Sequence, residues 1–143
     1  MASEKTSIYI DGAARGNPGP AGIGIIIKDA KGQDIRCLYK YIGETSNNLA
    51  EYTALIYALQ EALILGLKDL AVYSDSELLA KQLNGEYKVK NLGLKPYYEQ
   101  FLHLRTGLEN FKIKQIAREQ NKAADSLANQ AIDSRIDTGL KSA

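Results

Sequence analysis

The stretch IYIDGAARGNPGPAGIGIII, from Ile8 to Ile27, begins and ends as a β-strand but carries an acid and many glycines and prolines in between. Asp, Gly and Pro are all disfavoured inside strands. The stretch therefore predicts either a plain hairpin turn after Asp11 or an acid with a chemical role. Taken alone, an Asp-Gly pair gives roughly even odds for the two interpretations.

The 143 residues predict a single domain, 1–143, with a core from about residue 6 to 134 and a frayed tail over 135–143. Nine Lys and Arg and four Glu lie between Lys81 and Lys122, a net charge of +5, so the remainder of the +1 chain carries −4. This uneven charge predicts one surface that faces an anion and another that gathers acids.

The single cysteine, Cys37, leaves no partner for an internal disulfide and favours a reducing compartment. The polar first residues do not resemble a signal peptide, and no apolar run reaches the length needed to cross a bilayer. We therefore expect a cytoplasmic protein with no membrane partner. Nothing in the sequence requires more than a monomer or demands a protein partner.

Hydrophobic periodicity and turn signals predict five strands and four helices. The expected strands are 7–11, 22–28, 34–42, 69–74 and 112–117, and the expected helices are 48–65, 76–83, 96–108 and 121–134. Hairpin-linked strands followed by strands that alternate with helices indicate the α/β class, with helices packed on a mixed sheet. Binding sites in such folds gather near the carboxyl ends of central strands.

Four acids stand at the ends of these elements, and each has a simpler explanation. Asp11 fits a turn, Asp75 fits a helix start between Ser74 and Glu77, and Asp125 fits a first helical turn. Glu51 fits a capping pair with Asn48, but it also shares the apolar face of its helix, where an unpaired carboxylate is costly. Function is favoured over capping for Glu51 by about two to one on that cost.

The joint placement of the four acids is more informative than any one of them. Two follow strands and two lie in first helical turns, so they can converge on one side of the sheet. Clustered carboxylates repel unless cations lie among them, and an all-oxygen set suits Mg²⁺. The lone histidine, His103, lies among apolar neighbours and is interpreted as structural.

Four segments together resemble type 1 ribonuclease H, the enzymes that cut the RNA strand of RNA–DNA hybrids. The segments are DGAARGNPGPAGIG (11–24), SNNLAEYTAL (46–55), SDSELL (74–79) and REQNKAADSLAN (118–129), in the family's order and spacing. The resemblance covers nearly the whole chain. It implies a ribonuclease H-like fold with a five-stranded mixed sheet in the order 3-2-1-4-5 and helices on both faces.

The resemblance also implies roles for particular residues. The family's catalytic, metal-binding acids fall on Asp11, Glu51, Asp75 and Asp125. Main-chain groups of Gly12 and Ala14 are expected to meet ribose 2′-hydroxyls, which distinguish RNA from DNA. Positions that contact substrate in the family fall on Asn17, Asn47, Asn48 and Glu77.

The implied reaction is hydrolysis with two Mg²⁺ about 3.5–4 Å apart, giving 5′-phosphate and 3′-hydroxyl ends. Mn²⁺ is the alternative ion, and double-stranded RNA stays open as a further substrate. Many family members carry a histidine in the loop before the last acid, where this chain has none. Arg118 and Glu119 are the nearest candidates to replace it, and their interpretation as plain surface residues stands at about even odds.

Two further departures concern substrate binding. The position of Glu77 is often Gln in the family, and a negative group lies less favourably beside a nucleic-acid backbone. The segment 84–100 is too short for a long basic protrusion, although Lys88, Lys90 and Lys95 supply charge. Its tyrosines favour packing over base stacking by about three to one.

Three other functions remain open from the sequence alone. A non-catalytic nucleic-acid-binding module of the same fold would be expected to lose one or more of the acids, and all four are present. A different nuclease of the superfamily would share the fold and the metal chemistry. A structural protein whose acids are all caps and turns would show no metal dependence.

Overall fold

A five-stranded mixed sheet forms the centre of the structure, a computed structural model that describes residues 5–135. Its strand order is β3-β2-β1-β4-β5, which confirms the predicted order. The strands are β1 (Thr6–Ala14), β2 (Gly19–Lys28), β3 (Asp34–Thr45), β4 (Asp69–Ser74) and β5 (Asn110–Gln115). The first three pair antiparallel, whereas β4 runs parallel to both β1 and β5.

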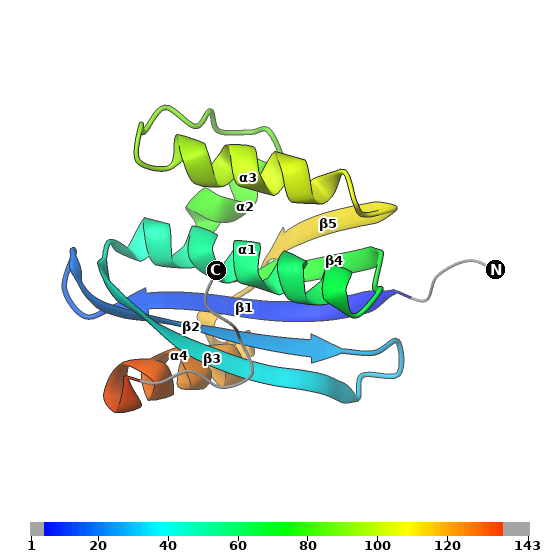
Figure 1. Ribbon diagram of the computed structural model, residues 1–143, viewed down its shortest axis with the longest axis horizontal. Helices are drawn as coiled ribbons and strands as arrows, with labels where there is room; N and C mark the ends of the chain where they lie inside the picture. The colour runs from blue at the N-terminus through cyan, green and yellow to red at the C-terminus, as the bar shows by residue number, and fades with distance from the viewer. Residues whose placement is uncertain (1–4, 136–143) are drawn as a thin grey trace.

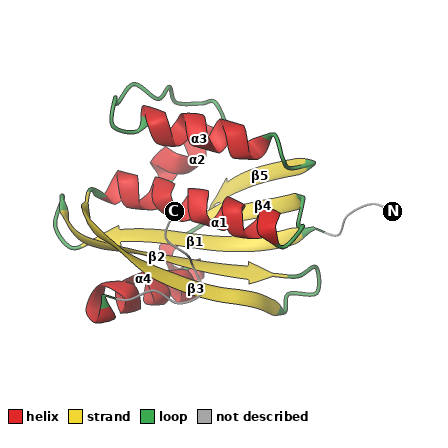
Figure 2. Ribbon diagram, viewed as in Figure 1, coloured by secondary structure: helices red, strands yellow, loops and turns green. Residues whose placement is uncertain are grey.

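Helices cover both faces of the sheet, as predicted (Figures 1 and 2). Three lie on one face: α1 (Asn47–Ile64), α2 (Glu77–Leu83) and α3 (Lys95–Arg105). The fourth, α4 (Lys122–Ser134), packs on the opposite face against β1, β2 and β3, and a short 3₁₀ turn, Arg118–Gln120, precedes it. None of the helices within residues 5–135 is long and apolar enough to cross a membrane.

The main core lies between the sheet and α1. Alternate residues of β1 and β2 point toward α1 and are fully buried. The apolar stripe of α1 meets them, because residues three and four apart share one face of a helix. The core residues that carry this contact are Ile8, Ile10, Ile23, Ile25, Ile27, Leu55, Ala58, Leu59 and Ala62.

The strands of the first hairpin are longer than the sequence predicts. β1 continues through Asp11 to Ala14 and β2 begins at Gly19, so residues 15–18 alone form the connecting loop. Propensity argues against strand here, but two helices need close contact with the main chain at these glycines, as described below. Tertiary packing therefore overrides the local preference.

The other boundaries differ by a few residues. β3 extends to Thr45 and β5 spans Asn110–Gln115 rather than 112–117, while α3 ends three residues earlier than predicted. Element ends depend on pairing and capping that periodicity does not encode. The predicted tail beyond Arg135 lies outside the described residues.

Candidate active site

Asp11 and Asp75 meet because their strands are parallel neighbours. Asp11 lies inside β1 opposite Gly24, and Asp75 directly follows β4. The chain turns sharply after β4: the Ser74 hydroxyl accepts a hydrogen bond from the N–H of Ser76 at 3.0 Å. The Ser76 hydroxyl, rather than that of Ser74, then caps α2, so the predicted capping pair of Ser74 with Glu77 is wrong.

Glu51 approaches the two aspartates from α1. Its side chain is 8 % exposed, and Oε1 accepts a hydrogen bond from the N–H of Gly12 at 2.6 Å. The helix cap is Ser46, whose hydroxyl accepts from the N–H of Leu49, so the less favoured alternative, a capping pair of Asn48 with Glu51, is wrong. Glu51 is instead aimed at β1.

This approach requires glycine at position 12. A Cβ at Gly12 would collide with the backbone of Ala50 and with the N–H of Glu51. The helix therefore rests directly on the main chain of β1, and the missing side chain sets how near Glu51 comes to Asp11.

Two glycines on the other face bring in the fourth acid. A Cβ at Gly22 would overlap the carbonyl of Ala128, and one at Gly24 would overlap the carbonyl of Ala124. Helix α4 therefore contacts the backbone of β2 directly. This contact places Asp125, in the first turn of α4, beside the strand that carries Asp11.

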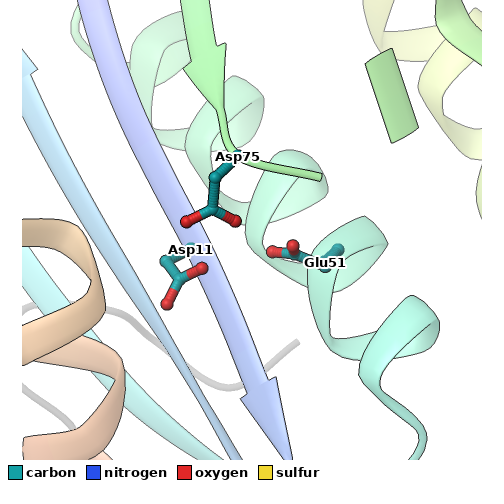
Figure 3. Close-up of side chains that lie close together, drawn as sticks. All are labelled: Asp11, Glu51 and Asp75. Atoms are coloured by element: carbon teal, nitrogen blue, oxygen red, sulfur yellow. The ribbon is translucent and has the colours of Figure 1, made fainter. Parts of the chain in front are cut away.

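The carboxylates of Asp11, Glu51 and Asp75 converge on one point (Figure 3). One oxygen from each residue lies within 4.8 Å of the others. Asp125 lies outside this group of three but lines the same pocket, and it is among the groups that raise the pKa of Asp11. The sequence predicted that all four acids converge; the structure brings three of them into one tight group and places Asp125 beside it in the same pocket.

Burial and the charges of neighbouring acids raise the pKa values of Asp11 and Glu51. Burial first, and then the charges of Glu51 and Asp75, raise the pKa of Asp11 from 3.8 to about 9. Burial raises the pKa of Glu51 to about 8, although the hydrogen bond from Gly12 and the charge of Arg118 act in the opposite direction. Such a site gains most from a cation, because oxygen ligands and unshielded negative charge suit a hard divalent ion.

A pocket of about 470 Å³ surrounds the acids. Four of the six predicted substrate contacts line it: Gly12, Ala14, Asn47 and Asn48. Arg118, one of the two candidates to replace the loop histidine, lines it as well. Two of these are already tied together, since the N–H of Ala14 donates to Oδ1 of Asn47 at 2.8 Å.

The remaining predicted contacts lie outside that pocket. Asn17 stands in the hairpin loop, where its Oδ1 accepts from the N–H of Asn47 at 3.2 Å. Glu77 is exposed, accepts a hydrogen bond from the Tyr87 hydroxyl and pairs with Lys81 at 3.5 Å. Glu119, the other candidate to replace the loop histidine, is exposed within the 3₁₀ turn and also lies outside the pocket.

The aromatic residues near the basic segment divide between packing and exposure. Tyr97 and Tyr98 pack against the core, whereas Tyr87 is 42 % exposed and lies under the ammonium group of Lys81. His103 is exposed on α3 rather than enclosed by apolar neighbours. No buried contact therefore supports the structural role that was predicted for His103.

Two asparagines contact the acids but were not predicted as site residues, although both lie one helical turn from Asp125. Asn121, which is 1 % exposed, donates from Nδ2 to the carbonyl of Ile10 at 2.8 Å and reaches Oδ2 of Asp75 at 3.5 Å. Asn129 donates to Oδ1 of Asp125 at 3.2 Å. Their spacing of four residues before and after an acid was the available signal.

The chain resembles known proteins over most of its length. A family model described as reverse transcriptase-like matches residues 9–131. Ribonuclease HI of Halobacterium salinarum is 39% identical over 125 residues, which cover 87% of this chain and 63% of that protein. The bifunctional protein Rv2228c of Mycobacterium tuberculosis is 39% identical over 130 residues, which cover 90% of this chain and 36% of that protein. The chain thus spans less than two thirds of each of these two relatives.

A solved structure matches more completely. LC11-RNase H1, crystallised in complex with an RNA/DNA hybrid, superposes with a TM-score of 0.88 and 46% sequence identity. The match covers 91% of this chain and 98% of that one. With the strand order and the acid cluster described above, these similarities show that the chain belongs to the type 1 ribonuclease H family.

Proposed function

We propose that this protein is an endonuclease that hydrolyses the RNA strand of RNA–DNA hybrids and leaves 5′-phosphate and 3′-hydroxyl ends. One observation carries the proposal: oxygens of Asp11, Glu51 and Asp75 lie within 4.8 Å of one another, in a pocket open to solvent. Proteins rarely bury unpaired carboxylates together without a chemical reason. The hybrid bound to LC11-RNase H1 supports the choice of substrate.

The residues fit two divalent cations, Mg²⁺ first and Mn²⁺ as the alternative. Asp11, Glu51, Asp75 and Asp125 would hold them, because the donor set is all oxygen. When bound, such cations supply an activated water and stabilise the leaving 3′-oxygen. The chain itself holds the ligands in place: Gly12 orients Glu51, and Asn121 orients Asp75.

Main-chain carbonyls are the groups we propose for reading the ribose. The N–H groups of Gly12 and Ala14 bond away from β2, to Glu51 and Asn47. In an antiparallel pair the N–H and C=O of one residue point to the same side. The carbonyls of Gly12 and Ala14 therefore point toward the pocket side, where a 2′-hydroxyl could donate to them.

Arg118 is the better candidate to replace the loop histidine. It lines the pocket, and its charge acts on Glu51, whereas Glu119 lies outside. We propose that the Arg118 guanidinium contacts the phosphate of the substrate or product rather than transferring protons, because arginine stays charged at all working pH values. Glu77 pairs with Lys81 and lies outside the pocket, so we propose that it contacts the nucleic acid only at the edge of the binding surface.

Hybrid binding should depend strongly on salt. Lys88, Lys90 and Lys95 lie along the segment that follows α2, and each phosphate contact releases counterions. Double-stranded RNA as a second substrate and a monomeric state remain predictions. A reducing, cytoplasmic location also stays a proposal, supported by the exposed free thiol of Cys37.

The test is cleavage of end-labelled RNA–DNA hybrid, double-stranded RNA and double-stranded DNA in Mg²⁺ or in EDTA. Asp75→Asn should abolish cleavage, while Asp69→Asn, at the other end of the same strand, should not. Internal cuts in the RNA strand that need metal and Asp75 would support the proposal. Intact hybrid with preserved binding would indicate a non-catalytic module, and trimming from the ends would indicate a different nuclease.

A further inference from the structure

The side chain of Arg15 links the β1–β2 hairpin to α4. Its Nη1 donates to Oδ1 of Asp133 at 2.6 Å, and its Nη2 donates to Oδ1 of Asn129 at 3.2 Å and to the Asn129 carbonyl at 3.4 Å. The loop that follows β1 is therefore bound to the helix that carries the fourth acid.

Asn129 connects this arginine to Asp125. Its Nδ2 donates to Oδ1 of Asp125 at 3.2 Å and to the Asp125 carbonyl at 3.0 Å. A guanidinium can only donate and a carboxylate accepts, so the amide of Asn129 has one orientation that satisfies both. Arg15 thereby fixes which end of the amide faces Asp125.

The other flank of the same hairpin is bound to α1. Ala14 donates to Asn47, and Asn17 accepts from the main chain of Asn47. The hairpin therefore touches both helices that carry acids, α1 with Glu51 and α4 with Asp125. On the α4 side, the contact is made by the side chain of Arg15, which bonds to the side chains of Asp133 and Asn129 and to the Asn129 carbonyl.

We infer that Arg15 and Asn129 are positioning residues for Asp125, and that Arg15 acts through Asn129. Asp125 is half-buried at a helix start and lies outside the tight group of three acids, so its carboxylate needs an external donor to hold one orientation. This inference rests on the proposed function, because it assumes that Asp125 takes part in metal binding.

The consequence for metal affinity follows from the way ligands are held. Residues that orient a metal ligand typically change metal affinity or activity about 10–100-fold when removed. Asn129→Ala should therefore raise the Mg²⁺ concentration for half-maximal cleavage by about 10-fold or more. Arg15→Met should raise it by a smaller factor, roughly 3-fold, and by nothing further when Asn129 is already alanine.

The experiment measures two quantities on the whole chain for wild type, Arg15→Met, Asn129→Ala, the double variant and Asp125→Asn. The first is cleavage against Mg²⁺ concentration, with kcat and KM for hybrid separated. The second is the rise in unfolding temperature on adding Mg²⁺ without nucleic acid. The second measurement excludes any effect of the Arg15 charge on hybrid binding.

Arg36→Met is the matched control, because Arg36 also pairs with an acid on a helix, Glu61 at 3.6 Å, but away from the pocket. Asp133→Asn removes the ion pair of Arg15 and keeps its bond to Asn129. We expect both variants to behave as wild type in Mg²⁺ dependence. Unfolding temperatures in EDTA show whether each variant is folded.

Non-additive losses for Arg15 and Asn129, seen both in Mg²⁺ dependence and in the thermal shift, would support the inference. Independent, additive effects, or an effect on KM alone, would refute it. If wild type cleaves hybrid and Asp125→Asn does not, but Asn129→Ala matches Arg36→Met, the positioning role fails and the proposed function stands. If wild type shows neither cleavage nor a thermal shift with Mg²⁺, the proposed function fails, and the inference with it.

Discussion

Replacing Asp11 with asparagine should make the metal-free protein more stable at alkaline pH, although it should abolish cleavage. The sign follows from the raised pKa of Asp11. A carboxyl that holds its proton more tightly in the folded chain contributes stability that is fully present below pH 3.8. That stability is lost as the pH rises through about 9. Asparagine does not titrate, so the variant lacks this loss.

The size of the effect can be worked out in two ways. Each pH unit inside the window corresponds to about 1.4 kcal/mol, so one such group costs about 4 kcal/mol between pH 5 and pH 8. As a check on that size, ionising both carboxylates of a pair no more than 4.8 Å apart would cost at least about 3.5 kcal/mol at an effective dielectric constant of about 20, which is why Asp11 keeps its proton. We therefore expect the Asp11→Asn advantage to grow by about 3–4 kcal/mol from pH 5 to pH 8 in EDTA.

Urea denaturation at pH 5, 6.5 and 8, in EDTA and in Mg²⁺, provides the assay. Urea is uncharged, so it leaves the repulsion unscreened. Glu99→Gln, on the exposed surface of α3, controls for the change in total charge. Mg²⁺ should stabilise wild type at pH 8 more than the variant. If the variant is no more stable than wild type at pH 8 in EDTA, or if its gain in stability is the same at pH 5, then folding does not raise the pKa of Asp11.

Three further predictions concern the packing near the acids, a buried hydrogen bond and the binding of the hybrid. Gly24→Ala should lower the free energy of unfolding by about 1–3 kcal/mol and cut cleavage at least tenfold, because the new Cβ meets the Ala124 carbonyl; urea denaturation and initial rates check this. Tyr52→Phe should cost about 1–3 kcal/mol and leave Mg²⁺ dependence unchanged, because Oε1 of Gln82 loses its buried donor at 2.6 Å. Raising salt from 50 to 200 mM should raise KM steeply with little change in kcat, as steady-state kinetics would show.

The parts of the fold that depend on local pattern were predictable. The helical face of α1 followed from Leu55, Ala58 and Ala62 at helical spacing. The strand order was predicted in a different way, from the family resemblance. Glu51 on that face was correctly expected to be buried, because the same spacing that buries the leucines also buries the acid.

The features that depend on contacts between segments far apart in the sequence were not predictable. Residues 12–14 and 19–21 form strand because they pair with β2 and β3 and because α1 rests on Gly12, and no local preference encodes these contacts. Asn121 and Asn129 look like ordinary helix residues in the sequence, and their amides acquire roles only when β1, β4 and the hairpin lie beside them. Glu77 differs, because its pair with Lys81 follows from helical spacing and only the hydrogen bond from Tyr87 depends on the fold.

Because Gly12, Gly22 and Gly24 have no side chains, α1 and α4 contact the main chain of the sheet directly at these positions. The distance between the acids is thereby set by main-chain contact, which is nearly incompressible, rather than by side chains that can repack. An added methyl group at any of the three would push a helix away from the sheet, and with it Glu51 on α1 or Asp125 on α4.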